Sequence, residues 1–265
     1  TGKLLFTLCG HDGVVTALSY SHCGRRLLTA SLDGTARTWD AETGAQVLVL
    51  SSTSGALYDA DYSPSGHRIL TTSFGGAAVI WDANTGDEVH QLIGHSGVVF
   101  SGMFSDDGET ILTVSKDGSA RVWYAETGRS LEVLGIEGTK IRHATYSPIS
   151  SLEVLGATES GRLIHWRWIE ASSCWLQTLL SDRNIAIAVF SPCAHRVIAC
   201  TRDYKVWLLT LCGDGGASEE VLLMESETYE VQSAGFSPCG RLVATASGGV
   251  TGTVRLWDAE SLVER

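Results

Sequence analysis

The chain has 265 residues, of which 44% are apolar and 18% charged, so it holds enough apolar material for a sizeable buried core. This composition excludes long disorder, and no apolar run approaches the roughly 20 residues that a membrane-spanning helix needs. The net charge of −11 excludes a protein that grips a nucleic-acid backbone over a broad basic face, although it leaves room for a local basic patch.

The first 50 residues predict short strands joined by tight turns. Apolar residues recur with strand-like spacing in four runs, at Val14–Tyr20, Arg26–Ala30, Ala36–Trp39 and Gln46–Leu50. Turn-forming residues separate these runs, at His22–Arg25, Asp33-Gly34 and Glu42–Gly44. We therefore expect four short antiparallel strands in this first stretch of the chain.

The same stretch recurs along the whole chain. Tryptophan returns at intervals of 42, 42, 43, 41 and 50 residues, at Trp39, Trp81, Trp123, Trp166, Trp207 and Trp257. An aromatic residue followed by serine precedes each tryptophan, and all four prolines directly follow the serine of such a pair. Six copies of a four-stranded unit are expected, stacked around an axis because one such unit cannot bury both its faces alone.

Short motifs within these copies resemble the WD40-repeat family. The first copy carries Gly10-His11, Ser31, Asp33-Gly34 and Trp39-Asp40, and the third repeats this pattern with Gly94-His95, Ser115, Asp117-Gly118 and Trp123-Tyr124. The resemblance covers essentially the whole chain. It implies an all-β fold, a β-propeller of four-stranded antiparallel blades.

The resemblance also implies how the chain is organised. We expect a single WD40 domain over residues 1–265, with repeats at about 9–50, 51–92, 93–134, 135–179, 180–224 and 225–265. In this family the first strand commonly completes the last blade, so residues 1–8, with a strand at Lys3–Leu8, are expected to close the ring. A closed ring of six blades and part of a seven-bladed ring both remain open. Because the chain begins with Thr1, we expect it to be a segment of a longer protein or a trimmed form.

In this family a His, a Ser, an Asp and a Trp of one blade form a hydrogen-bonded chain. Two such tetrads are expected, His11, Ser31, Asp33 and Trp39 in the first repeat and His95, Ser115, Asp117 and Trp123 in the third. Ser, His and Asp also build hydrolytic triads, but two widely separated copies with each serine in a strand favour a structural role. We therefore predict no catalytic residue and no enzymatic activity.

The other four repeats depart from this pattern, for example with Thr53 and Gly75 where the second repeat should have histidine and aspartate. The fifth repeat lacks two residues before Trp207, and the sixth gains two around Gly248–Thr251. We expect these repeats to depend more on apolar packing and to open more readily.

Family members of this kind usually bind peptides or protein surfaces on the rim at one end of the central channel. Two groups of residues stand out at the corresponding positions: an aromatic patch of Tyr58, Phe74 and Phe100, and a basic arc of Lys116, Lys140, Arg142 and Arg202. Aromatic residues and arginine most often anchor interfaces, so an apolar partner residue flanked by acidic ones would suit this rim. The alternative is that Tyr58 and Phe100 only pack between blades.

Several other features have ordinary explanations. We expect Trp166, Trp168 and Trp175 to pack on an outer strand and not to form a cation-binding cage. The seven cysteines form no CxxC pair and no zinc-like cluster, so we predict no metal, no cofactor and a reducing intracellular compartment, cytoplasmic or nuclear. The insert Gly213–Glu220 is expected to be a surface loop.

The function predicted from these observations is a non-catalytic scaffold that presents propeller faces to protein or peptide partners, as part of a larger assembly. Alternatives are a sensor propeller attached to an NTPase or another enzyme, and less favoured, a propeller hydrolase or a nucleic-acid binder. No membrane partner is expected.

Overall fold

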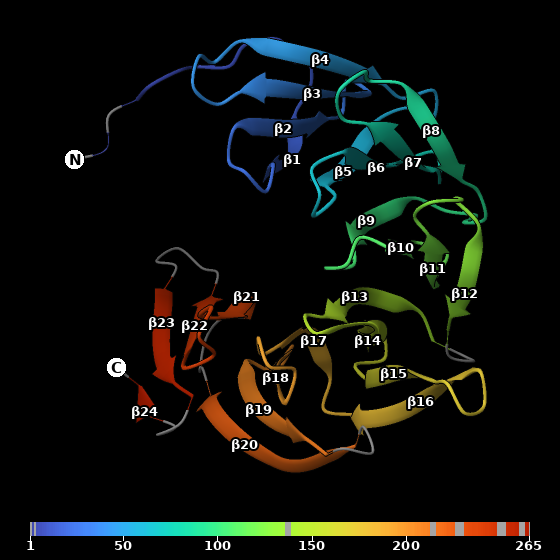
Figure 1. The fold of residues 1–265 in the computed structure, drawn as a ribbon. Coiled ribbons are helices and arrows are strands. Elements are labelled where there is room, and N and C mark those ends of the chain that lie inside the picture. The colour runs from blue at the N-terminus through green and yellow to red at the C-terminus, as the bar shows by residue number, and fades with distance from the viewer. Residues whose placement is uncertain are drawn as a thin grey trace. The chain divides into compact units, whose positions relative to one another are not determined.

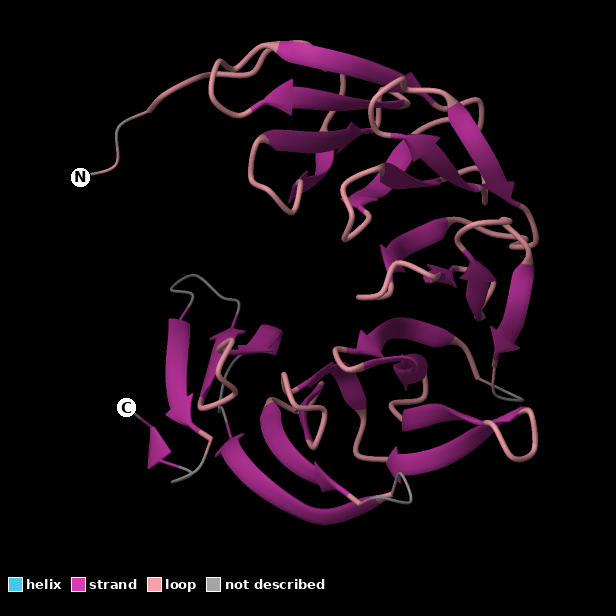
Figure 2. Ribbon diagram, in the orientation of Figure 1, coloured by secondary structure: helices cyan, strands magenta, loops and turns pink. Residues whose placement is uncertain are grey.

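The computed structural model of the chain describes residues 2, 4–135, 139–212, 216–225, 231–247, 253–259 and 263–264. Within these residues it contains twenty-four β-strands and no helix (Figure 2). The chain divides into two compact units, Thr1–Leu134 and Gly135–Arg265, and each is described by itself. The all-β fold class predicted from the sequence is confirmed.

Each unit contains three four-stranded antiparallel sheets, numbered 1 to 6 along the chain (Figure 1). Sheet 1 comprises β1 (Val15–Tyr20), β2 (Arg26–Ser31), β3 (Thr35–Asp40) and β4 (Gln46–Ser51). Sheet 2 comprises β5 (Leu57–Tyr62), β6 (Arg68–Ser73), β7 (Ala78–Asp82) and β8 (Glu88–Leu92). Sheet 3 comprises β9 (Val99–Phe104), β10 (Thr110–Ser115), β11 (Ala120–Tyr124) and β12 (Ser130–Leu134).

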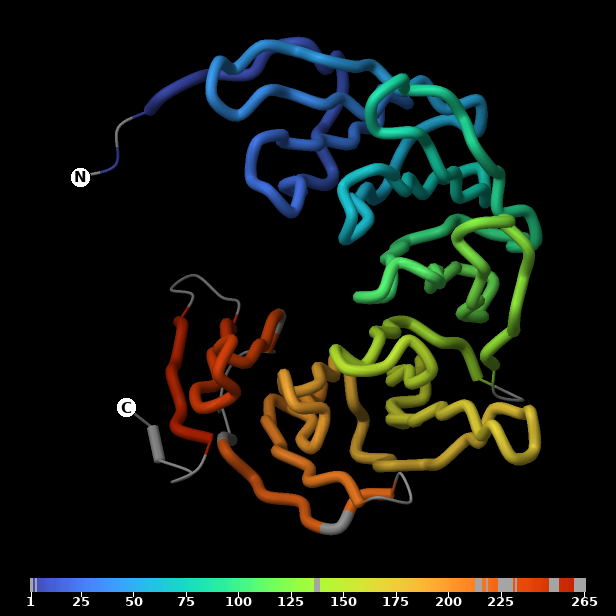
Figure 3. Tube along the Cα trace, viewed as in Figure 1, coloured from blue at the N-terminus to red at the C-terminus, as the bar shows by residue number. Residues whose placement is uncertain are grey.

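The second unit repeats this arrangement. Sheet 4 comprises β13 (Ile141–Ser147), β14 (Ser150–Thr158), β15 (Leu163–Ile169) and β16 (Cys174–Ser181). Sheet 5 comprises β17 (Ile185–Phe190), β18 (Arg196–Thr201), β19 (Lys205–Leu211) and β20 (Ala217–Glu225). Sheet 6 comprises β21 (Val231–Phe236), β22 (Leu242–Ser247), β23 (Thr253–Asp258) and β24 (Val263–Glu264). Strands of every sheet pair in chain order, so the trace completes one sheet before it enters the next (Figure 3).

The four strands predicted in the first repeat are confirmed to within one residue at each end. The turn between β2 and β3 shows why the sequence is informative here. Gly34 has a φ of +85°, which a residue with a side chain rarely adopts, and its N–H donates to the Ser31 carbonyl at 3.2 Å. Local turn chemistry therefore sets the strand boundaries.

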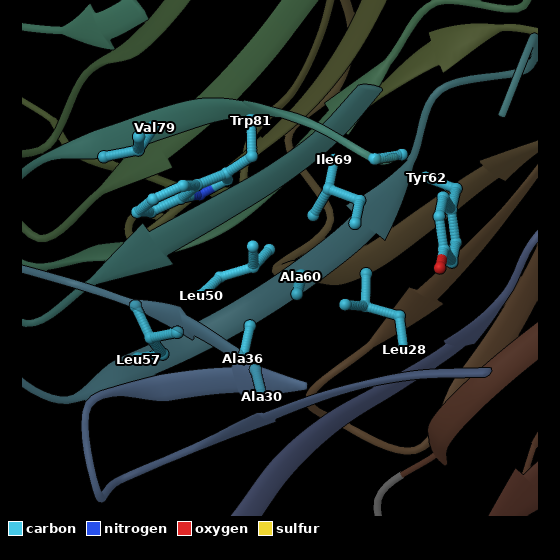
Figure 4. Packing of buried hydrophobic residues seen from close by; sticks show 11 residues of the cluster. Leu28, Ala30, Ala36, Leu50, Leu57, Ala60, Tyr62, Ile69, Val79 and Trp81 are labelled. Carbon is cyan, nitrogen blue, oxygen red and sulfur yellow. The ribbon is translucent and has the colours of Figure 1, made fainter. Parts of the chain in front are cut away.

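Consecutive sheets within a unit pack face to face. Between sheets 1 and 2, Leu28 and Leu50 meet Tyr62, Ile69 and Trp81, all of them buried (Figure 4). Each face alternates with the period of two that a strand imposes, so the opposite side chains of the same strands face the other neighbour. Burying one leucine or isoleucine in this way contributes about 1.5–3 kcal/mol relative to exposure.

The N-terminal segment differs from the prediction. The described residues of the expected strand at Lys3–Leu8, 4–8, form no strand, and Lys3 lies outside the described part of the chain. Phe6 instead lies against Gly44 of the first repeat. In sheet 6, β24 pairs with β23 through Trp257 with Glu264 and Asp258 with Val263, so the last repeat supplies its own fourth strand.

Candidate interaction surface

The first strand of every sheet contains a β-bulge at the same place. One residue is skipped in the pairing with the second strand, and these bulged residues are Thr16, Tyr58, Phe100, Arg142, Ala186 and Gln232. A bulge re-aims the skipped side chain and bends the strand locally. Three of the predicted partner-binding residues, Tyr58, Phe100 and Arg142, thus occupy the bulged position.

A backbone hydrogen bond fixes the second predicted rim position beside the start of the first strand. The N–H of the residue that precedes the turn between strands two and three donates to a carbonyl just before the first strand. In sheets 2 to 5 the donors are Phe74, Lys116, Glu159 and Arg202, and the acceptors are Ala56, Val98, Lys140 and Asn184, at 2.6–3.0 Å. Phe74, Lys116 and Arg202, which the sequence places at the rim, are therefore held by equivalent bonds in successive sheets.

Tyr58 contacts the other two predicted aromatic residues in the first unit, and we call Tyr58, Phe74 and Phe100 the aromatic cluster. The ring of Tyr58 lies 5.3 Å from that of Phe74 and 5.4 Å from that of Phe100, centroid to centroid. Phe100 belongs to sheet 3, so the cluster spans two sheets. Tyr58 and Phe74 nevertheless remain 39% and 45% exposed. The cluster is therefore both a contact between sheets and an exposed aromatic surface.

Three of the four residues of the predicted basic arc gather in the second unit. Lys140, Arg142 and Arg202 surround Glu159 in the second unit, and we call these four residues the basic cluster. A nitrogen of Arg142, Nη2, lies 2.5 Å from Glu159 Oε1, and Arg202 Nη1 donates to the Glu159 carbonyl at 2.9 Å. The fourth predicted cation, Lys116, is exposed in sheet 3 of the first unit.

Charge dominates the surroundings of Glu159. Its pKa lies below the usual value because Arg142 donates a hydrogen bond to the carboxylate, and the charges of Arg142, Lys140 and Arg202 add to this effect. Arg142 and Glu159 are 53% and 46% exposed, so solvent screens the pair. Three cations and one carboxylate leave a local excess of two positive charges.

Sheets 1 and 3 contain the hydrogen-bonded chains that the sequence predicts, but threonine replaces serine as the link. His11 Nδ1 lies 2.8 Å from Asp33 Oδ2, and His11 Nε2 lies 2.8 Å from Thr29 Oγ1. The indole N–H of Trp39 donates to the same hydroxyl at 2.9 Å. Ser31 only accepts the Asp33 N–H, so the assignment of serine to the network is wrong.

The network of sheet 3 is equivalent. Thr113 joins His95 and Trp123 at 2.8 Å each, while His95 Nδ1 lies 2.9 Å from Asp117. Ser115 instead bonds the Asp117 N–H and the Gly97 carbonyl, so here too serine is not the link. Both side chains lie on the same sheet face, because residues two apart share it, so the strand register is the reason. Trp123 pairs with Ile111, and the threonine is two residues from that pair whereas the serine is four.

The environment of this network shifts two pKa values. Burial alone would raise the pKa of Asp117, but hydrogen bonds from Ser119, His95 and Ser96 lower it to about 2. Burial lowers the pKa of His95, although Asp117 acts in the opposite direction. The imidazole is therefore neutral, donating from Nδ1 to Asp117 and accepting at Nε2 from Thr113, a tautomer inferred from these partners.

The remaining sheets keep parts of this arrangement. The indoles of Trp81 and Trp257 donate to Thr71 and Thr245, as in the complete networks. In sheet 5 the tryptophan is displaced: Leu209 pairs with Val197, where Trp81 pairs with Ile69 in sheet 2. The fifth repeat therefore has not lost two residues. Its Trp207 lies two positions earlier in the strand, under the guanidinium of Arg183 at 4.2 Å.

In sheet 4 the tryptophan finds a different partner. Trp166 donates weakly to Gln177 at 3.3 Å, and Gly156 stands where sheets 1, 2, 3 and 6 have threonine. A Cβ at Gly156 would lie 2.4 Å from the Trp166 ring, so the glycine makes room for the indole. Trp168 and Trp175 stack edge-to-face at 6.0 Å, which is packing geometry.

Three further features bear on metal binding, cysteine chemistry and membrane insertion. Among the described residues no group of three or more His, Cys, Asp or Glu side chains could hold a metal ion. All seven cysteines are free thiols, and Cys23, Cys193 and Cys239 each lie 3.3–3.5 Å from a serine hydroxyl in equivalent turns. No helix long and apolar enough to cross a membrane occurs in the described part of the chain.

The sequence pattern of one family matches more than half of the chain. The family described as "WD domain, G-beta repeat" matches residues 2–40, 44–82, 86–124 and 220–258. Most of sheets 4 and 5 lies outside these ranges. That agrees with Gly156 and Leu209, which replace a network threonine and a tryptophan in these sheets.

Two curated proteins of Schizosaccharomyces pombe are similar over short stretches. The "U3 small nucleolar RNA-associated protein 21 homolog" is 46% identical over 54 residues, which is 20% of this chain and 6% of that protein. The "Periodic tryptophan protein 2 homolog" is 50% identical over 40 residues, 15% of this chain and 5% of that protein. The aligned stretches thus span less than a tenth of either relative.

Proposed function

This chain belongs to the WD40-repeat family, and we propose that it is a non-catalytic scaffold that presents its rim to protein or peptide partners. We propose further that it works as a subunit or domain of a larger assembly in a reducing intracellular compartment. Members of the family generally act as binding scaffolds, and the free cysteines fit such a compartment.

The aromatic cluster is the observation that carries this proposal. Interfaces are anchored by a few aromatic and arginine side chains, and the aromatic cluster brings such side chains together at the surface. Tyr58 and Phe74 keep two-fifths of their surface exposed while their rings are fixed against each other. A pre-ordered aromatic surface loses little conformational entropy when a partner binds.

Catalysis by the His–Asp networks is disfavoured by their geometry. Thr29, His11 and Asp33 are bonded in the order of a hydrolytic triad, but Thr29 is only 6% exposed and its hydroxyl already accepts the Trp39 N–H. A substrate carbonyl cannot reach a hydroxyl enclosed in this way. The network supports a structural role that stiffens sheets 1 and 3.

Two alternatives lead to different measurements. A sensor propeller attached to an NTPase would respond to a small ligand or to the state of its enzyme. A role in an RNA-containing assembly follows only from the name of one relative, which covers 20% of this chain. Binding that weakens steeply with salt would favour the RNA alternative over a peptide partner.

We also propose that the six sheets close into one ring and need no seventh blade. In the first unit, Leu18 and Tyr20 of sheet 1 are 62% and 60% exposed, whereas Ala60 and Tyr62 at the same positions of sheet 2 are buried. In the second unit, Leu256 of sheet 6 is 47% exposed, whereas its equivalents are buried. Sheet 1 and sheet 6 therefore each have one exposed apolar face, which favours packing of these two faces against each other.

Affinity capture with a matched control tests the scaffold function. The variant Tyr58→Ala/Phe100→Ala removes the aromatic cluster, and Tyr124→Ala removes a 47% exposed tyrosine elsewhere in sheet 3. We expect partners identified by mass spectrometry to be lost from the first variant and kept by the second, with both folded by circular dichroism. Identical partners for all three proteins would refute binding through the aromatic cluster.

A further inference from the structure

The basic cluster of the second unit has a feature that the scaffold function does not explain. Its one carboxylate, Glu159, lies among three cations on the surface, bonded to Arg142. We propose that this cluster binds an acidic peptide segment, and that Glu159 occupies the place of a ligand carboxylate until the peptide displaces it. The inference rests on the proposed function, because it names the class of partner for one part of the rim.

The first support is the backbone of Glu159. Its N–H donates to the Lys140 carbonyl at 2.6 Å, and its carbonyl accepts from Arg202 at 2.9 Å. Both bonds use main-chain atoms of Glu159, so the carboxylate can turn away from Arg142 without breaking either of them. Because exposed ion pairs contribute little to stability, exchange for a ligand carboxylate costs little.

The second support is unused bonding capacity in the cluster. A guanidinium carries five N–H donors in a fork that matches a carboxylate, and Arg142 bonds Glu159 through Nη2. Arg142 occupies the bulged position of β13, which distinguishes its side chain from its strand neighbours. Once Glu159 is displaced, the three cations face the ligand with no internal anion to compensate them.

Charge and composition favour a peptide over a nucleic acid. Binding a phosphate backbone tightly requires many cations along a groove, whereas this chain carries a net charge of −11 and the basic cluster has three cations. Bases in single strands stack on aromatic rings. The rim positions of sheets 4 and 5 carry none, since they are Lys140, Arg142, Glu159, Asn184, Ala186 and Arg202.

Fluorescence anisotropy with a labelled hexaglutamate peptide tests the inference on the full chain. At low ionic strength we expect binding that added salt weakens and that a hexaglutamine peptide lacks. The variant Glu159→Gln keeps both main-chain bonds and removes the competing charge, so its affinity should rise about threefold to fivefold, as for one exposed ion pair. Arg142→Gln should lower the affinity by a similar factor.

Two controls and two contrary outcomes make the test decisive. Glu88→Gln and Arg129→Gln change exposed charges of the first unit and should leave the affinity unchanged. No hexaglutamate binding, or an unchanged affinity for Glu159→Gln, overturns the inference while the capture experiment on the aromatic cluster still stands. Tighter binding of a labelled oligouridine, lost in Arg142→Gln, would assign the cluster to nucleic acid instead.

Discussion

The hydroxyl of Thr113 has two buried partners, the indole of Trp123 and the imidazole of His95. Valine has nearly the same shape but no hydroxyl, so Thr113→Val leaves an indole N–H and a ring nitrogen without a partner. Each such group costs about 1–3 kcal/mol. We expect Thr113→Val to lower the free energy of unfolding by about 2–4 kcal/mol, measured by urea denaturation.

Two matched variants separate this effect from general disturbance of the strand. Thr71 of sheet 2 bonds only a tryptophan indole, so Thr71→Val should cost about half as much. Ser115 lies outside the Trp123–His95 link, and Ser115→Ala should also cost less than Thr113→Val. Equal losses for the threonine and serine variants of sheet 3 would contradict the network.

The carboxylate of Asp117 makes stability depend on pH. It accepts hydrogen bonds only, from His95 and Ser96 at one oxygen and from Ser119 at the other, so Asp117→Asn would turn an NH₂ group toward donors. The pKa of about 2 in the folded state lies below the usual value, and the stability it gives is therefore present above about pH 4.

We expect this stability to be lost as the pH falls from about 4 to about 2, and the loss to be smaller in Asp117→Asn. His95 acts in a different window, since its lowered pKa destabilises the fold as the pH falls below about 6.5 in both proteins. Urea midpoints measured from pH 7 to pH 2 distinguish the two. An unchanged slope below pH 4 in the variant would assign the dependence to other groups.

At the level of elements, the strand boundaries could be predicted well from the sequence, because local turn chemistry determines them. Turn glycines such as Gly34 and the alternation of apolar residues fix the strands of the first repeat, and the structure has them within one residue. The bulges could not be predicted, because they depend on pairing with a second strand and no residue type marks them. Tyr58, Phe100 and Arg142 share that position and are chemically unrelated.

Two predictions about individual residues were wrong because they too depend on how strands pair. The family pattern assigned Ser31 to the network, whereas the structure uses Thr29 on the same sheet face. Strand register explains this, because Thr29 lies two residues closer than Ser31 to the position that pairs with Trp39. Spacing made Trp207 equivalent to the other tryptophans, whereas strand pairing gives that place to Leu209. Contacts across strands therefore limited the interpretation of the candidate site more than they limited the fold.

The complete networks lead to a prediction about whole sheets. Sheet 2 lacks the histidine and aspartate but is packed against sheet 1 on one side and sheet 3 on the other. We expect amides of β6 and β7 to exchange with solvent faster than those of β10 and β11, measured by hydrogen exchange under native conditions. Slower exchange in sheet 2 would show that packing outweighs the polar network.

At the scale of the whole molecule, side-chain sizes support the proposed closed ring. In the first unit, the position of Gly102 in sheet 3 faces Leu70 of sheet 2, so a small residue meets a large one. In the first and last sheets the large and the small residue are exchanged between these two positions. Sheet 1 has Leu18 where sheet 3 has Gly102, and sheet 6 has Ala244 where sheet 2 has Leu70.

Exchanging the two residues tests whether sheet 6 covers sheet 1. If Leu18 and Ala244 are in contact, Leu18→Ala leaves a cavity and Ala244→Leu overfills the interface, each costing about 1–3 kcal/mol. The double variant should then recover at least about 1 kcal/mol, while distant sites add within about 0.5 kcal/mol. Strictly additive losses in urea unfolding of the monomer would mean that these two positions are not in contact, and the open face of sheet 1 would then need another blade to cover it.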